Sequence, residues 1–258
     1  LYIVHGAGLN VLIFNTLAKK MHPDQPIFGL QAKGLNGIDE PLERIEDMAA
    51  HYISEIINHN PNGPYALAGF SFGGMIAFEM AKQLKAVGKE VSMLAMFDTE
   101  VSQTHKFKPF PARTIYSAKH LINQLLFTFV LLREDPKRTI EYKTESLKRR
   151  LIQLYWKIKY GKDQSQPGFF GYSNKIDQQN EIAAENYILT PYDGSIEIFR
   201  AKKRTFYMAD FEYLGWKPFA LKGVRIHDIP GEHNYIFAPP NDKEFAHILQ
   251  KCLDNAVI

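Results

Sequence analysis

Short apolar runs alternate along the chain with longer segments in which apolar residues recur every three or four positions. Short runs are typical of buried strands, and the longer spacing is typical of helices that turn one face toward a sheet. The strands predicted in this way are Leu1–Val4, Pro26–Gln31, Tyr65–Ala68, Val91–Phe97, Ser195–Arg200 and Val224–Ile229, and the helices are Val11–Met21, Ile45–Asn58, Met75–Val87 and Asp242–Leu253. This alternation predicts an α/β fold with a mostly parallel central sheet flanked by helices.

The alternation breaks between residues 102 and 190, where no strand-like run occurs and the segments His120–Leu132 and Leu147–Lys159 have a helical period. We therefore expect one domain over residues 1–258, with a helical lid inserted at residues 102–190. Residues 103–190 carry 15 Lys and Arg against 8 Asp and Glu, a net charge of +7. This charge favours either an ordinary solvated helix surface or a surface that docks an acidic partner.

Composition narrows the class of protein. A length of 258 residues suits one domain with a large insertion, and a net charge of +3 gives no support to nucleic-acid binding. The single cysteine, Cys252, is expected to pack in the core and favours a reducing compartment. We expect a cytoplasmic protein, because no leader precedes the first strand and no stretch approaches a membrane span. The chain starts at Leu1 inside an apolar run, which suggests a segment of a longer polypeptide.

The strongest chemical signal is Gly-Phe-Ser-Phe-Gly-Gly at residues 69–74, between a predicted strand and a predicted helix. A G-x-S-x-G motif in this context predicts a nucleophile elbow, in which a sharp turn exposes the serine hydroxyl. The turn brings neighbouring backbone close to the positions two before and two after the serine, so only glycine fits there. Ser71 is therefore the predicted nucleophile, and Gly69 and Gly73 are the predicted elbow glycines.

A serine hydroxyl needs a histidine as general base and a carboxylate to orient that histidine. His233 is the predicted base, because it lies in a turn-rich loop directly after the last strand, whereas His227 lies within that strand and is interpreted as structural. Two carboxylates are candidates for the acid. Asp98 directly follows a strand and is favoured, while Asp210 follows the next strand at a distance of about ten residues and remains open.

Acyl transfer also requires hydrogen-bond donors for the oxyanion, usually two backbone N–H groups. We expect one from Phe72, at the start of the helix after the serine, and one from Ala7, in the loop after the first strand. The glycines around Ala7 are also half of a dinucleotide-binding fingerprint, but Val11 occupies the place of its third glycine. The nine histidines show no metal-binding spacing, so no metal is expected.

Five segments carry a further signal: PIFGLQAKGL at 26–35, NGPYALAGFSFGGMIAFEMAKQL at 62–84, YDGSIEIFRA at 192–201, LGW at 214–216 and PGEH at 230–233. Together they resemble the thioesterase domains that end nonribosomal peptide and polyketide synthetases, within the α/β-hydrolase superfamily. The resemblance implies an α/β-hydrolase fold with a helical lid, and Ser71, Asp98 and His233 match the catalytic triad of that family.

The resemblance also implies a reaction. Such a thioesterase releases an acyl or peptidyl chain from the phosphopantetheine arm of a carrier-protein domain, upstream in the same polypeptide, through an acyl-enzyme on Ser71. Release by hydrolysis and release by macrocyclisation both remain open, and the domain itself is expected to bind no cofactor. Three alternatives also remain: a stand-alone editing thioesterase, a carboxyl-ester hydrolase and a non-catalytic module that keeps the fold.

Overall fold

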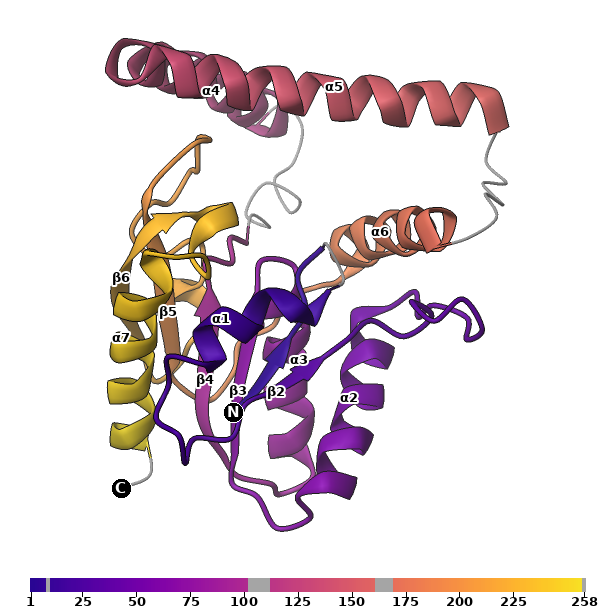
Figure 1. The fold of residues 1–258 in the computed structure, drawn as a ribbon, viewed down its shortest axis with the longest axis vertical. Coiled ribbons are helices and arrows are strands. Elements are labelled where there is room, and N and C mark those ends of the chain that lie inside the picture. Colours follow the sequence, from indigo (N-terminus) through magenta and orange to yellow (C-terminus); the bar gives the residue numbers. More distant parts are fainter. Residues whose placement is uncertain (8–9, 102–111, 161–168, 257–258) are drawn as a thin grey trace.

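A computed structural model of the protein describes residues 1–258 except 8–9, 102–111, 161–168 and 257–258 (Figure 1). Six strands form one sheet in the order β2-β1-β3-β4-β5-β6, and every neighbouring pair is parallel. The strands are β1 Tyr2–Val4, β2 Phe28–Leu30, β3 Tyr65–Phe70, β4 Val91–Phe97, β5 Ile196–Lys203 and β6 Val224–Glu232. The predicted α/β fold with a parallel sheet is therefore confirmed.

Helices cover both faces of the sheet (Figure 1). The helices α2 (Ile45–His59) and α3 (Gly73–Ala86) pack on one face, and α1 (Asn15–Ala18) and α7 (Asn241–Ala256) pack on the other. The predicted inward face of α3 is fully buried at Ile76, Met80 and Leu84. Burying an aliphatic side chain of this size contributes about 1.5–3 kcal/mol, so these two layers of apolar contacts hold the sheet in place.

The first helix differs from its prediction. In place of one helix over Val11–Met21, the chain forms a 3-10 helix, η1 (Val11–Phe14), followed by the single turn of α1. Only Phe14 and Leu17 are buried in these two elements, so one short stripe faces the core. Lys19 and Lys20 then form a turn, and Met21 reaches the core from outside the helix, so the predicted helix was too long.

The last two strands extend past their predicted ends. The register pairs Arg200 with Asp228, Ala201 with Ile229 and Lys203 with Glu232, with an irregularity before the last pair. In this stretch the backbone hydrogen bonds between β5 and β6 continue the two strands, although the side chains there are polar and do not predict strands. Two 3-10 helices flank β6, namely η2 (Lys217–Phe219) and η3 (His233–Tyr235).

Among the described residues, three helices lie between β4 and β5: α4 (Ala112–Glu134), α5 (Pro136–Tyr160) and α6 (Phe169–Asn186). Figure 1 shows α4 and α5 together above the carboxyl edge of the sheet, with α6 above the layer formed by α2 and α3. The first two were predicted, whereas α6 was missed because its buried apolar residues are sparse. Its end is held by the hydroxyl of Tyr187, which donates to Glu79 of α3 at 2.6 Å.

One helical stretch within the described residues, Thr114–Glu134 in α4, is long and apolar enough to cross a membrane by length and composition, and none of it is buried. By this measure the expectation that no stretch approaches a membrane span was wrong. The mean hydropathy of 1.3 was hidden in the sequence by interspersed Asn, Gln and Thr residues. A single helix of this kind is weak evidence for a membrane, since it rests on composition alone.

Candidate active site

Ser71 directly follows β3 and adopts a φ of 52°, in the left-handed region that residues other than glycine rarely enter. Its N–H donates to the carbonyl of Phe97 at 3.0 Å, which ties the turn to the neighbouring strand β4. A Cβ atom at Gly69 would overlap the backbone of Gly73, and a Cβ atom at Gly73 would overlap the carbonyl of His5. The chain therefore has the sharp, glycine-dependent turn that the motif predicts.

The structure brings the three predicted side chains together at the carboxyl edge of the sheet. His233 Nε2 lies 3.1 Å from the hydroxyl oxygen of Ser71, and His233 Nδ1 lies 2.8 Å from Oδ2 of Asp98. When Nδ1–H donates to the carboxylate, Nε2 is left as an acceptor for the serine proton. This is the hydrogen-bond geometry that a general base requires.

The second candidate acid, Asp210, is engaged elsewhere. Its carboxylate accepts three backbone hydrogen bonds of 3.0 Å, from Glu212, Tyr213 and Gly215. These bonds shape the turn that leads into the buried Trp216. Of the two carboxylates, the structure therefore places Asp98 against the imidazole and gives Asp210 a role in the loop.

Asp98 is buried and has a φ of 48°, a second left-handed residue in the site. Its Oδ1 atom accepts from the N–H of Ala201 at 2.9 Å and from Nη1 of Arg204 at 2.8 Å. Burial alone would raise the pKa of Asp98, but the hydrogen bond from His233, the charge of Arg204 and the Ala201 N–H together hold it below its ordinary value. The acid is therefore ionised and fixed at both oxygens.

Sequence reasoning missed Arg204. It lies just beyond β5, past the predicted end of that strand, and its side chain is only 12% exposed. Next to it, burial and the nearby Asp98 and Asp210 raise the pKa of Glu100 to about 7, while Arg204 lowers it. Arg204 thus lies between the carboxylates of Asp98 and Glu100, which belong to the loop after β4. No local sequence motif marks the position of Arg204.

The loop that carries Asp98 is anchored by the segment Leu214-Gly215-Trp216. The indole N–H of Trp216, which is fully buried, donates to the carbonyl of Thr99 at 2.8 Å. The N–H of Val101 donates to the carbonyl of Leu214 at 2.9 Å. Although this segment lies more than a hundred residues after the loop, it fixes the direction in which the carboxylate points.

Aromatic rings and an ion pair surround His233. The ring of Phe70 stacks on the imidazole with centroids 4.9 Å apart, and Phe206 meets it edge-on at 6.1 Å. The preceding residue, Glu232, binds Arg138 of α5 through two hydrogen bonds, one of them 3.1 Å between Nε and Oε2. The start of α5 is therefore tied to the residue next to the histidine.

The two predicted oxyanion donors stay predictions. Phe72 is the N-cap residue of α3, where backbone N–H groups and the helix dipole favour negative charge. Ala7 lies in an exposed turn after β1, directly before residues 8–9, which fall outside the described residues. The buried His5 stabilises the same loop, because its Nδ1 lies 2.7 Å from the carbonyl oxygen of Gly6.

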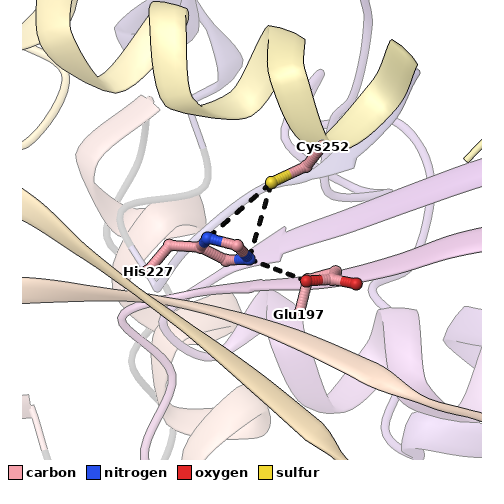
Figure 2. Close-up of side chains that lie close together, drawn as sticks. All are labelled: Glu197, His227 and Cys252. Carbon is pink, nitrogen blue, oxygen red and sulfur yellow. Dashed lines mark hydrogen bonds and ion pairs between the residues drawn. The ribbon is translucent and has the colours of Figure 1, made fainter. Parts of the chain in front are cut away.

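A second cluster of titratable side chains lies away from Ser71, where α7 crosses β5 and β6 (Figure 2). His227 Nε2 lies 2.7 Å from Glu197, and the sulfur of Cys252 lies 3.5 Å from Nε2 and 3.8 Å from Nδ1. A sulfur almost equidistant from both nitrogens must lie over the ring face, since in the ring plane it would overlap the carbon between them. A metal ion would need the in-plane lone pair, so this geometry fits a packed ion-pair cluster.

This arrangement bears on two sequence interpretations. His227 lies within β6 and pairs with Glu197 of β5, as expected of a structural strand residue. Cys252 is only partly buried, so the expectation of a core position was too strong, although it packs against the core on the α7 side. The reason is that its side chain lies beside His227 at the margin of the core cluster.

The cluster predicts a pH-dependent contribution to stability. Contact with Cys252 and Glu197 raises the pKa of His227 from its ordinary value of 6.5 to about 9. A pKa raised by folding stabilises the fold fully below pH 6.5, and this contribution is lost as the pH rises through about 9. His227→Gln is therefore expected to lower the melting temperature more at pH 6 than at pH 10. Thermal unfolding of both proteins measures the difference, with the exposed His22→Gln as control, and an equal loss at both pH values contradicts this assignment.

Comparison with known proteins points in one direction. A family model described as "Thioesterase domain" matches residues 1–254. Aspulvinone E synthetase melA of Aspergillus terreus is 26% identical over 270 residues, which cover 98% of this chain and 28% of that protein. Malpibaldin synthetase of Mortierella alpina is 40% identical over 100 residues, covering 38% of this chain and 2% of that protein. The chain thus spans less than a third of the length of these curated relatives.

Solved structures agree in fold. The NocB thioesterase domain in covalent complex with a fluorophosphonate nocardicin G analog aligns with a TM-score of 0.66 at 22% identity, covering 98% of this chain and 93% of that one. The four-domain nonribosomal peptide synthetase AB3403 aligns with a TM-score of 0.68 at 24% identity, covering 97% of this chain and 19% of that one. At these identities the likeness establishes a shared fold.

Proposed function

Because the chain belongs to the thioesterase domain family, we propose that it releases an acyl or peptidyl chain from a carrier-protein phosphopantetheine thioester in nonribosomal peptide or polyketide biosynthesis. The observation that carries this proposal is the continuous hydrogen-bonded series from Ser71 through His233 to Asp98. Its support includes relatives named as synthetases, of which this chain matches only a part.

In the first half of the proposed reaction, His233 Nε2 takes the proton of Ser71 as the serine oxygen attacks the thioester carbonyl. The N–H groups of Phe72 and Ala7 are the proposed donors to the oxyanion. When the tetrahedral intermediate collapses, the carbon–sulfur bond breaks and the imidazolium returns its proton to the leaving thiolate. Asp98 stabilises the imidazolium and keeps Nε2 directed at the serine.

In the second half, His233 deprotonates the nucleophile that attacks the acyl-enzyme. If that nucleophile is water, the product is a free acid, and if it is an amine or hydroxyl of the bound chain, the product is a macrocycle. The same three side chains serve both outcomes, so both remain within the proposal.

The remaining features of the proposal concern the setting of this domain. Residues 1–258 form one catalytic domain, with residues 102–190 as its lid. The substrate arrives on the phosphopantetheine arm of a carrier domain in the same polypeptide, and the reaction needs no metal and no cofactor bound by this domain. The assignment to the cytoplasm rests on the single cysteine and on this biosynthetic role.

A comparison of substrates tests the proposed function. The protein is incubated with an acyl group on a carrier-protein phosphopantetheine arm and with the same acyl group on a matched oxygen ester, and product is quantified by mass spectrometry. The carrier-bound thioester is expected to react faster by a wide margin. Equal or faster cleavage of the oxygen ester would favour a carboxyl-ester hydrolase, and no reaction with either would favour a non-catalytic module.

Arg204 is expected to act as a positioning residue through Asp98. Arg204→Met removes a charged hydrogen bond, which is worth about 1.5–3 kcal/mol, so kcat/KM should fall by roughly 10- to 100-fold. Loss of the positive charge beside Asp98 should also move the acid limb of the pH–rate profile to higher pH, with Asp98, Glu100 and Asp210 left as the nearby acids. A pH–rate profile measures both effects.

The control for Arg204→Met is Lys202→Met, which alters an exposed cation near the end of β5 that pairs with Glu244. That variant should keep both the rate and the pH profile. A purely structural role for Arg204 would lower the rate without moving the pH–rate profile, and that result would contradict the positioning role.

A further inference from the structure

The helices α4 and α5 expose large apolar side chains in a regular order. The α4 stripe consists of Ile115, Ala118, Ile122, Leu125, Phe129 and Leu132, and the α5 stripe consists of Ile140, Thr144, Leu147, Leu151, Leu154 and Ile158. All of these residues are exposed, and the large apolar ones among them are 39–75% exposed. An apolar surface of this extent on a folded domain marks an interaction site.

The spacing within each stripe indicates what covers it. Successive members lie three and four residues apart in strict alternation, from Ile115 to Leu132 and from Ile140 to Ile158. This is the heptad pattern of helices whose side chains interlock with those of another helix. A membrane surface accepts apolar side chains at any spacing that keeps them on one face. The unbroken heptads therefore favour helices as the partner.

Both stripes point away from the sheet. Phe127 of α4 packs on Phe211 with ring centroids 5.6 Å apart, and Asn123 donates to the hydroxyl of Tyr207 at 3.0 Å. Tyr142 of α5 lines a cavity of about 460 Å³ beneath the two helices. Successive residues of a helix are rotated by about 100°, which puts each stripe on the side opposite these inward residues. Closure of α4 and α5 onto the sheet would leave the stripes uncovered.

The two stripes form one surface. A single residue, Asp135, separates α4 from α5, the two helices are in contact, and the chain runs back along α4 (Figure 1). No other described element lies beyond them on the outer side (Figure 1). A two-helix surface with two heptad stripes is complementary to another two-helix surface of the same kind, and the four helices then form a bundle.

Charged residues beside the stripes specify which helices can pair. One flank of the α5 stripe carries Lys143 and Arg150, so two copies of α5 packed antiparallel would bring these cations together. The corresponding flank of the α4 stripe carries the neutral Leu121 and Thr128. Packing of α5 on the α4 of a second copy therefore avoids this repulsion.

The other flank supports the same pairing. Glu141 lies beside the α5 stripe near the start of that helix, and Arg133 lies beside the α4 stripe near its end. A twofold axis parallel to the helices lays each α5 antiparallel on the partner's α4, which brings this acid and this cation to the same end of the bundle. The same surface then serves both copies, so the assembly closes as a dimer.

We propose that two copies of this chain associate through the α4 and α5 stripes into a four-helix bundle, in which each α5 packs antiparallel on the α4 of the partner. The inference is independent of the proposed function. The bundle holds both helices in place above the cavity that Arg204 and Glu232 also line.

Sedimentation velocity over a concentration series tests the dimer. Residues 1–258 are expected to sediment with twice the mass of one chain. Leu125→Glu and Leu147→Lys should each raise the dimer Kd about 100-fold or more, because each buries an unpaired charge twice in the symmetric interface. The matched controls are Ile38→Glu and Leu221→Lys, at isoleucine and leucine residues that are exposed elsewhere, and both should remain dimeric. Circular dichroism should show every variant folded, since the changed side chains are exposed in the single chain.

A mixture of the two variants tests the pairing of the helices. In a mixed dimer, Glu at position 125 of one copy faces Lys at position 147 of the other, and the second contact keeps both leucines. At a concentration where each variant alone is monomeric, the equimolar mixture is expected to form dimers. Failure to recover dimers would overturn the pairing of α4 with α5.

Three other outcomes would overturn the dimer itself. The first is a chain that stays monomeric throughout the series, and the second is a dimer that neither variant weakens. The third is a monomer that floats with vesicles of phosphatidylcholine and phosphatidylserine and loses this binding in Leu125→Glu, which would assign the stripes to a membrane surface. Thioester cleavage is unaffected by the choice among these outcomes, so failure of this inference leaves the proposed function standing.

Discussion

Ser71→Ala is expected to abolish formation of the acyl-enzyme and to lower kcat on the order of 10⁶-fold, the loss seen when the nucleophile of a serine triad is removed. No other hydroxyl replaces it, because His233 Nε2 is directed at the Ser71 oxygen at 3.1 Å. The fold should survive, since the change removes one oxygen from a half-buried turn and leaves the backbone hydrogen bond to Phe97 in place. Intact-mass spectrometry after incubation with a carrier-bound substrate measures the acyl group.

A control variant and a melting temperature complete this test. Ser54→Ala, at an exposed hydroxyl on α2, is the matched control and should acylate like the unchanged protein. The melting temperature of Ser71→Ala should be the same as that of the unchanged protein or higher, because alanine has no side-chain hydroxyl that the turn must hold in one orientation. An acyl group of the expected mass on the Ser71→Ala variant would assign the nucleophile to another residue.

Asp98→Asn is expected to lower kcat about 10⁴-fold while leaving the fold intact, as an amide at this position of a triad favours the wrong tautomer of the histidine. The amide N–H₂ group would replace either Oδ1, which accepts from Ala201 and Arg204, or Oδ2, which is paired with His233, so the hydrogen bonds at that position are lost. Steady-state rates with one thioester substrate measure the effect.

Asp210→Asn is the variant with which Asp98→Asn is compared. Its carboxylate accepts from the backbone N–H groups of Glu212, Tyr213 and Gly215, and the amide oxygen of asparagine retains part of that pattern. We expect a modest loss of stability and a rate within about tenfold of the original, since Asp210 bonds the backbone of its own loop and not the imidazole of His233. A crippled Asp210→Asn beside a near-normal Asp98→Asn would move the acid to the later loop.

The residues whose position follows from local chain geometry are the ones that sequence reasoning located. Ser71 lies on a turn whose glycines are visible in the motif, and Asp98 directly ends a strand with clear apolar character. The carboxyl ends of parallel strands meet at one edge of a sheet, so His233, after the last strand, falls beside them. Short-range pattern and parallel topology together were sufficient for these side chains.

The positions of Arg204 and Arg138 in the site depend on contacts between segments that are distant in the sequence. No local sequence pattern predicts these positions. Arg204 reaches Asp98 only because β5 continues beyond its apolar part, paired with β6. Arg138 reaches Glu232 only because α5 folds back over the end of β6. The helix α6 was missed for a related reason. Its few buried side chains, such as Ile176 against Ala32, leave too weak a period in the sequence.

The proposed mechanism requires an acyl group to pass from a carrier thioester to Ser71 before release. The most direct measurement is a rapid-quench experiment with excess protein and a carrier-bound substrate, followed by proteolysis and mass spectrometric mapping of the acyl group. A transient species is expected whose acyl mass maps to Ser71 and which decays as product appears. The Asp98→Asn variant, which slows both steps, is measured in parallel. Product formed without that species would contradict the proposed mechanism, and so would an acyl group mapped to any other side chain.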